Sequence, residues 1–370
     1  MAVTDFGALS KAQKRVWSAE LWQAGRDKSF FFANGFIGKN DTDSGSVIQR
    51  INDLTETERG MECVMQLVQD LQGDGVAGDN ELDGNEEAMV NDAQAIRLDQ
   101  LRHGVKSKGE MAEQATIIRF RTQGKEKLAF WMADKLDELM FLTLSGRPYT
   151  LRTDGRTRVR SELPSLKFAA DVRAPSQGRR VYAGQATSEG DITANDRLSW
   201  ETVVRANAMA SEKRLRPLRN GGKEHFVMVI HPRQKRDLVL DPTYITVLRS
   251  AEKPGSNHPL FTGALATIDG TIIHSHNKVF HTGGLPAGQR WGIGGNVHGA
   301  QALYLGAQAA GIALLGGVFW RESTLTDYGN RPGIGVGRKI GMLKPQFQSL
   351  YDEGRREDFG VVSISTAAAA

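Results

Sequence analysis

The sequence predicts an α+β protein built from two unlike halves. All eleven prolines lie at or after Pro148, so residues 1–147 can hold long elements without a break. Beyond Pro148 the chain is rich in turn residues and in short hydrophobic runs, such as residues 225–230, that are typical of buried strands. Within the first half, residues 60–100 are acidic and rich in glycine, a composition that cannot form a packed core alone.

The composition is that of a folded protein, with 370 residues, 40% of them hydrophobic and 24% charged. Cys63 is the only cysteine, which excludes an internal disulfide and argues against a cysteine-based metal site. No apolar run reaches the roughly 18 residues of a membrane span, and no signal peptide is visible. We therefore expect a soluble protein, made in a reducing compartment, with no membrane partner.

Residues 1–46 are predicted to form an N-terminal arm. Ser10 and Gln13 form a capping-box pattern at the start of an amphipathic helix over residues 11–24. The aromatic residues expected to anchor this arm on another element or another subunit are Trp17, Trp22, Phe30, Phe31 and Phe32. The alternative for the three phenylalanines is an ordinary place in the core.

The acidic segment is predicted to be the tip of a two-armed extension. Residues 60–100 carry ten acidic side chains and one basic one, a net charge of −9. The flanks at residues 62–71 and 88–101 have regularly spaced apolar residues, so the extension needs a neighbouring molecule to rest on. The acidic residues expected to contact another subunit are Asp74, Asp79, Glu81, Asp83, Glu86 and Glu87. Such an extension is typical of a self-assembling shell protein rather than of an enzyme.

The longest predicted helix covers residues 110–146. Its apolar residues recur at helical spacing, and at ~1.5 Å per residue it would span roughly 50 Å. Gly146 and Pro148 end it. Gly124 lies near its middle, where we favour simple tolerance of glycine at an exposed site over a bend.

The second half is predicted to be rich in strands. Asp269 and Gly270 stand between two short apolar runs and indicate a tight hairpin. Further strands are expected at residues 225–230, 278–280, 302–305, 312–318 and 359–366. The final four alanines are expected to form a loose tail.

Two basic clusters follow the predicted helix. Residues 147–180 carry a net charge of +6, and residues 205–223 carry a net charge of +5. Such clusters suit nucleic acid or an acidic protein surface, and a solvated face is the alternative. Because the acidic segment belongs to the same chain, copies of the protein can be complementary to each other. The candidate docking residues are Arg147, Arg152, Arg156, Arg158 and Arg160.

The sequence contains no pattern of catalytic residues that we can identify. The glycine-rich residues 291–296 and 333–341 match neither a P-loop nor a dinucleotide-binding pattern, so both are predicted to be loops. His274, His276 and His281 are closely spaced, but no carboxylate partner is local, so we favour structural histidines over a metal pair. We therefore predict no enzyme activity, no cofactor and no metal.

These features together resemble a known family. The short motifs that carry the resemblance lie at residues 78–88, 99–104, 108–114, 231–232, 257–261 and 327–330. Their wording and order resemble the major capsid proteins of tailed bacteriophages with the Hong Kong 97-like fold, in the branch found in Enquatrovirus-type podophages. The resemblance covers residues 17–366, nearly the whole chain.

The resemblance implies an architecture and a set of partners. It implies an N-terminal arm at residues 1–46, an E-loop with its base at 47–105 and the spine helix of a P-domain at 106–149. It further implies an A-domain at 150–318, and strands that return to the P-domain with a C-terminal tail at 319–370. It implies pentamers and hexamers that form an icosahedral virion capsid, assembled in the bacterial host cytoplasm around double-stranded DNA. A separate scaffolding protein, a portal and a decoration protein are the other implied partners.

The charge distribution adds a mechanism to this resemblance. We expect the acidic loop to dock on basic surface of a neighbour, either among residues 147–180 or on the spine helix. Exposed ion pairs contribute only about 0–1 kcal/mol each, so apolar residues must be buried as well. The apolar residues expected to be buried with the loop are Val64, Leu67, Val68, Met89 and Ile96.

Some members of the superfamily cross-link their shells through an E-loop lysine. No lysine occurs here between Lys39 and Lys106, so a non-covalent shell is predicted. Two other interpretations stay open. One is an encapsulin-type nanocompartment, which shares the fold, and the other is a soluble nucleotide-dependent enzyme that uses the glycine-rich loops.

Overall fold

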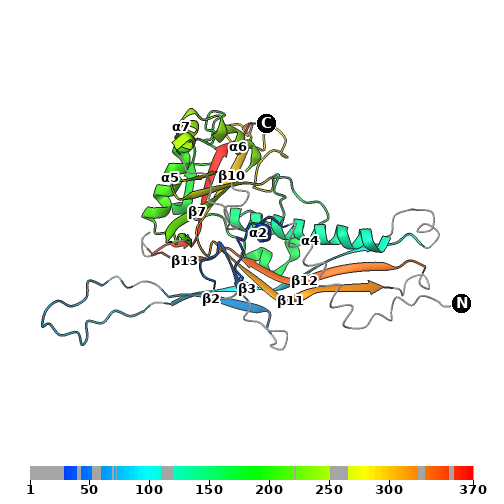
Figure 1. Ribbon diagram of the computed structural model, residues 1–370, viewed down its shortest axis with the longest axis horizontal. Helices are drawn as coiled ribbons and strands as arrows, with labels where there is room; N and C mark the ends of the chain where they lie inside the picture. The colour runs from blue at the N-terminus through cyan, green and yellow to red at the C-terminus, as the bar shows by residue number, and fades with distance from the viewer. Residues whose placement is uncertain are drawn as a thin grey trace.

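The computed structural model describes residues 29–39, 43–51, 60–68, 71, 73–89, 91–109, 120–220, 222–250, 266–323, 330–349 and 354–369. Trp17, Trp22 and the helix predicted over residues 11–24 lie outside this part of the chain. The described residues form an elongated molecule, with a loop at one end and a long helix and long strands reaching toward the other (Figure 1). A layered region of sheet and helices rises from its middle.

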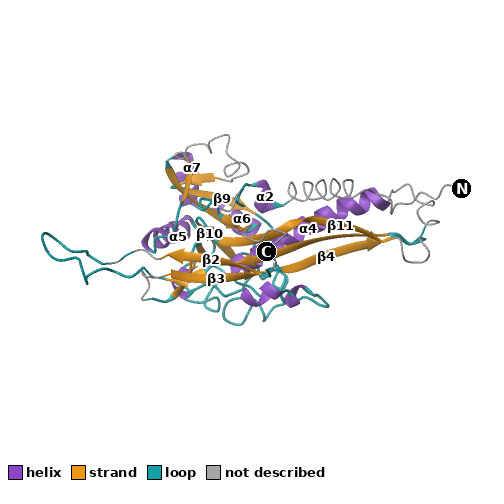
Figure 2. Ribbon diagram, turned by 90° about the horizontal axis from the view of Figure 1, so that it is seen from below, coloured by secondary structure: helices purple, strands orange, loops and turns teal. Residues whose placement is uncertain are grey.

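The first sheet has four strands in the order β1-β11-β12-β4. These strands are β1 (Ile48–Ile51), β11 (Ala310–Ser323), β12 (Gly333–Leu343) and β4 (Asp99–Lys106). Strand β1 is parallel to β11, and the other pairs are antiparallel. The helix α4 (Phe120–Ser145) runs along this sheet, as seen from a second direction in Figure 2.

Strand β12 corrects one prediction, because its glycine-rich residues were expected to be a loop. Two glycines of this strand let a neighbour approach closely. A Cβ on Gly337 would lie 2.3 Å from the ring of Phe319, and one on Gly341 would lie 2.5 Å from the backbone oxygen of Arg97. Gly337 and Gly341 are therefore packing positions within a paired strand, and neither belongs to a nucleotide-binding loop.

The second sheet has seven strands in the order β5-β15-β10-β7-β9-β8, with β6 paired to β7. They are β5 (Arg180–Tyr182), β15 (Val361–Ala367), β10 (Gly299–Leu305), β7 (Lys223–Ile230), β9 (Thr271–Ser275), β8 (Ala266–Ile268) and β6 (Leu218–Asn220). One face packs against α5 (Trp200–Glu212), α6 (Pro232–Val239) and α7 (Pro242–Ser250). The other face shares the main core with α4.

Most predicted strands are confirmed, including the hairpin at Asp269 and Gly270, where both residues have positive φ. Residues 278–280 are not a strand, since they leave a turn at residues 277–278 as irregular chain. The predicted end of the A-domain at residue 318 falls inside β11. Strand β15 joins the seven-stranded sheet and does not join the four-stranded sheet. The prediction of a loose tail for the final four alanines is wrong in part, because Ala367 and Ala368 are buried.

A two-stranded ribbon carries the acidic loop. Strands β2 (Glu62–Val68) and β3 (Asn91–Arg97) are antiparallel. Their side chains Cys63, Met65 and Ile96 pack against the four-stranded sheet. A small hairpin, β13 (Gln346–Gln348) with β14 (Arg356–Asp358), lies at the base of the ribbon. Residues 73–89, called the acidic loop below, extend from the ribbon away from the rest of the molecule (Figure 1).

Short helical turns complete the fold. They are α2 (Phe30–Ala33), η2 (Leu163–Ser165), η3 (Lys167–Asp171) and η4 (Gln177–Arg179). The helix α4 confirms the later part of the predicted long helix, and residues 110–119 lie outside the described residues. It ends at Gly146, whose φ of 64° is the left-handed conformation that glycine favours at this position.

Gly124 is buried rather than exposed, which corrects the interpretation favoured from sequence. A Cβ at this position would lie 3.3 Å from a methyl group of Val105 and 3.6 Å from one of Ile334. The helix therefore needs a small residue here in order to approach the sheet.

We expect Gly124→Leu to lower the free energy of unfolding by about 1–3 kcal/mol through overpacking. Gly124→Ala should stay within about 1 kcal/mol of the parent, because its gain in helix propensity offsets a tight contact. Urea denaturation of the unassembled subunit measures both. A Leu variant as stable as the parent would show that the helix does not pack closely at this point.

Candidate functional site: a basic groove and an acidic loop

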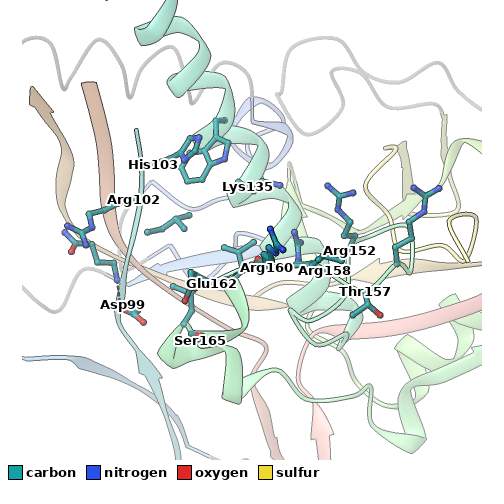
Figure 3. A pocket seen from close by; sticks show the side chains of 18 residues that line it. Asp99, Arg102, His103, Lys135, Arg152, Thr157, Arg158, Arg160, Glu162 and Ser165 are labelled. Carbon is teal, nitrogen blue, oxygen red and sulfur yellow. Dashed lines mark hydrogen bonds between the residues drawn. The ribbon is translucent and has the colours of Figure 1, made fainter. Parts of the chain in front are cut away.

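A groove of about 960 Å³ lies between β4, α4 and the segment of residues 152–166. We call it the basic groove, because its lining contains six basic residues and two acidic ones. The basic residues are Arg102, Lys135, Arg152, Arg156, Arg158 and Arg160, and the acidic ones are Asp99 and Glu162. Figure 3 shows Lys135, Arg158 and Arg160 close together, with Arg102 and His103 on the strand beside them.

The floor of the groove is held by ion pairs within the chain. Arg158 and Lys135 each lie 2.5 Å from a different oxygen of Glu138, and the Arg158 side chain is only 6% exposed. The Nε of Arg158 also donates to the backbone oxygen of Leu151. Arg158 therefore stabilises this subunit, which corrects its assignment as a docking residue.

The rim of the groove is exposed and basic. Arg152, Arg156 and Arg160 are exposed, and Arg156 lies 3.6 Å from Asp154 while keeping 61% of its side chain exposed. Arg160 has a φ of 51°, which is uncommon for a residue other than glycine. Such a conformation persists where the surrounding structure holds the backbone in place. Next to it, Val159 is 83% exposed.

The opposite wall comes from the edge strand β4. His103 stacks on Trp131 of α4, with 4.4 Å between the ring centres, and this contact fixes the helix beside the strand. Arg102 extends from the same strand. Arg102 and His103 were not predicted from the sequence, because they reach the residues around Arg156 only through the pairing of β4 with β12.

Arg147 lies away from the groove and has partners in its own chain. It forms an ion pair with Glu189, donates to Gln301 over 3.0 Å, and lies over the ring of Phe280 at 4.4 Å. The prediction that Arg147 docks a neighbour is therefore corrected. Of the five predicted arginines, Arg152, Arg156 and Arg160 are the ones that the structure leaves exposed at the groove.

The acidic loop has six acidic residues and no basic one. All six predicted residues are exposed, and they are Asp74, Asp79, Glu81, Asp83, Glu86 and Glu87. The loop is shaped by its own hydrogen bonds, in which Gly73 N donates to Glu87 over 2.6 Å and Gly84 N donates to Glu86 over 2.8 Å. Among the described residues, Asp79 and Asp83 form no ion pair, so their charge is available to a neighbour.

The apolar residues that were expected to be buried with the loop differ in their exposure in the subunit. Ile96 is completely buried in its own chain, which removes it from the docking set, and Leu67 is half-buried. Val64, Val68 and Met89 are 49%, 58% and 75% exposed. Alternation along β2 places Val64 and Val68 on the exposed face and Leu67 on the opposite one, because successive side chains point to opposite faces of a strand.

The three consecutive phenylalanines pack within the subunit. Phe31 is buried against Phe141 of α4, with 4.7 Å between the ring centres, and Phe30 lies at 5.7 Å from the same ring. The turn is tied to α4 by Asp137, which accepts hydrogen bonds from Ser29 Oγ over 2.6 Å and from Phe30 N over 2.7 Å. Burial raises the pKa of the Asp137 carboxyl, and these two bonds oppose that shift.

Within the described residues, no group of three or more His, Cys, Asp or Glu side chains is arranged to hold a metal ion. No described helix is long and apolar enough to cross a membrane. The basic groove and the acidic loop carry opposite net charges, and this complementarity points to recognition between macromolecules.

Comparison with known proteins gives the same answer. Residues 5–370 match the family model described as phage capsid protein. The chain is 43% identical over 375 residues to the major capsid protein of Pseudomonas phage KPP25, covering 99% of this chain and 98% of the relative.

Solved structures agree in fold. The capsid of Ralstonia phage GP4 superposes with a TM-score of 0.79 and 30% identity, covering 100% of this chain and 99% of that one. The capsid asymmetric unit of cyanophage Pam1 matches with a TM-score of 0.68 and 20% identity, covering 91% and 92% of the two chains. The predicted Hong Kong 97-like α+β fold is thereby confirmed. The chain belongs to the phage capsid protein family, and it is a major capsid protein.

Proposed function

We propose that copies of this major capsid protein assemble as pentamers and hexamers into the icosahedral shell that encloses phage double-stranded DNA, and that the acidic loop of each copy docks in the basic groove of a neighbour. The observation that carries this proposal is the complementarity of two exposed surfaces on one chain. The loop has six acidic residues and no basic one, whereas the groove has six basic residues and two acidic ones.

The shape of the molecule supports docking between copies. The acidic loop extends away from the rest of the subunit (Figure 1), whereas the basic groove is lined by β4, α4 and residues 152–166 (Figure 3). A loop placed in this way is directed toward a neighbour rather than toward its own groove. The repeated contact then joins unlike surfaces, an arrangement that forms closed rings when the rotation between copies closes.

The energy of docking comes from charge and apolar contact together. Exposed ion pairs contribute about 0–1 kcal/mol each, so three of them give at most about 3 kcal/mol. Val64, Val68 and Met89 add apolar surface next to the loop, at about 25 cal/mol for each Å² buried. On the receiving side, Phe130 on α4 and Val159 at the groove are 55% and 83% exposed.

Other partners follow from the family rather than from a site on this chain. A separate scaffolding protein, a portal and a decoration protein would complete the particle, which would assemble in the host cytoplasm. DNA would be contacted without base readout, through positive charge such as that of Lys223, which is exposed at the start of β7.

Purified protein imaged by negative-stain electron microscopy, alone and with a scaffolding protein, tests the proposed shell. Closed particles or sheets of pentamers and hexamers are expected. On a denaturing gel the particles should run as one monomer band, because the acidic segment lacks lysine. A discrete small oligomer at high concentration would contradict the shell, and a ladder of multimers would contradict non-covalent assembly.

A further inference from the structure

Three histidines share one local geometry. In each, the ring Nδ1 accepts a hydrogen bond from the backbone N–H two residues further along the chain. The distances are 3.3 Å from Arg233 N to His231, 3.2 Å from Lys278 N to His276, and 3.0 Å from Gly283 N to His281. A backbone N–H can only donate, so each Nδ1 must be unprotonated. We call His231, His276 and His281 the histidine triad.

The triad lies where the helix α4 meets the seven-stranded sheet. His276 stacks on Phe141 of α4, with 5.1 Å between ring centres and 10° between ring planes. Two residues later, Lys278 pairs with Asp134 of α4 over 2.5 Å. The turn around His276 therefore connects the end of β9 to the long helix.

The other two histidines connect the same region to the sheet. Their rings are 4.3 Å apart, and His231 caps the start of α6. Gln234 of that first turn donates to the backbone oxygen of Ala300 on β10 and to Thr366 on β15. The backbone N–H of His281 donates to Thr153, just beyond the end of α4. Loss of the three hydrogen bonds to the histidine Nδ1 atoms would thus loosen α6 and the turns that contact α4.

The charged groups that face the triad are two cations and two carboxylates. Arg233 faces His231 and His281, Lys278 faces His276, and His298 faces His281. Asp154 and Asp134 are the carboxylates that face His281 and His276. Burial, reinforced by these cations, lowers the pKa of His231 to about 3 and that of His276 to about 4. Burial also lowers the pKa of His281.

We propose that the histidine triad is an acid-released latch between α4 and the seven-stranded sheet. At neutral pH the three rings are uncharged and accept the three backbone bonds. A proton added to Nδ1 converts that atom from acceptor to donor, so it then opposes the backbone N–H that it had bound. The same proton places a charge beside Arg233 or Lys278.

The direction of the effect follows from linkage. In an open state each histidine titrates near its ordinary pKa of 6.5, whereas in the closed state it resists protonation. Stability of the closed state is therefore complete above about pH 6.5 and falls as the pH decreases toward 4. At pH 4.5, two units below the ordinary pKa, each histidine shifts the equilibrium toward opening by about 100-fold at most.

Asparagine supplies a matched test, because its side-chain oxygen accepts the bond from the N–H two residues on and does not titrate. The experiment compares the parent with His231→Asn/His276→Asn/His281→Asn, and with His103→Asn as a control histidine on Trp131. Amide hydrogen exchange of residues 231–235 and 276–284 is measured at pH 7.5 and 4.5, corrected for intrinsic rates. It is run on subunits for every protein, and on particles only for the parent and the triple variant, because His103 lines the basic groove.

We expect protection in the parent and in the His103→Asn control to fall at least about tenfold between pH 7.5 and 4.5. The triple variant should change by less than about threefold over the same range. If the triple variant does not fold, His281→Asn alone should show a smaller fall in protection than the parent. Full protection of the parent at pH 4.5, or an equal fall in parent and asparagine variants, would overturn the latch.

Discussion

Replacing Asp79, Glu81 and Asp83 together by lysine is expected to abolish shell assembly while the subunit stays folded. All three side chains are exposed on the acidic loop, so the substitutions remove no core contact. Each one replaces an attraction of about 0–1 kcal/mol by a repulsion of similar size, which gives several kcal/mol at every repeated interface. Sedimentation velocity should show subunits or small oligomers in place of particles, with an unchanged circular dichroism spectrum.

A reversed groove tests whether the loop has the proposed partner. Arg152→Glu, Arg156→Glu and Arg160→Glu should block assembly in the parent and restore it in the lysine-loop variant. Glu212→Lys, an exposed acidic residue at the end of α5, serves as the control for surface charge reversal and should assemble normally. Lysine-loop subunits that assemble as well as the parent would rule out docking by charge, and failure of the combined variant would assign the loop to another surface.

Lys344→Met is expected to destabilise the subunit by about 3–5 kcal/mol, because it leaves a buried carboxylate without its cation. Lys344 and Asp358 are 1% and 0% exposed, and Nζ lies 3.0 Å from both carboxylate oxygens. Asp358 also accepts from Ser176 N over 3.0 Å and from Gln346 over 2.8 Å. Burial lowers the pKa of Lys344, and the neighbouring Asp358 carboxylate opposes that shift.

The pair matters because it lies at the base of the ribbon. Gln346, which bonds Asp358, also exchanges hydrogen bonds with Gln94 of β3. Urea denaturation of subunits measures the loss, and Arg356→Met is the matched control. Arg356 pairs with Asp92 at a half-exposed position and should cost less than about 1 kcal/mol. Equal costs for Lys344→Met and Arg356→Met would show that burial does not set the strength of the pair.

Local features of the fold could be predicted from the sequence where one segment determines its own structure. The acidic loop follows from its charge, the hairpin at Gly270 from its turn residues, and the helix α4 from its periodicity. The glycine-rich strand β12 could not be predicted in this way. Its glycines fit the ring of Phe319 and the backbone of Arg97, and these contacts exist only after β11, β12 and β4 have paired.

The site was predicted in part for the same reason. Net charge identified the basic cluster, but the exposed arginines could not be separated from the paired ones. Glu189 and Glu138, which pair with Arg147 and Arg158, are 42 and 20 residues away in sequence. Arg102 reaches the groove only through the register of β4 on β12. The sequence thus indicated that the proposed interface is charged. Ion pairs and strand pairs between residues far apart in the sequence decide which side chains are exposed at it.

An electron cryomicroscopy map of the assembled particle, at a resolution that shows side chains, tests the docking of loop and groove most directly. The account predicts Asp79, Glu81 or Asp83 of one copy within ion-pair distance of Arg152, Arg156 or Arg160 of its neighbour. It also predicts that Val64 and Val68 are covered in the shell. Acidic loops that face solvent, or that contact no basic residue of an adjacent copy, would contradict it.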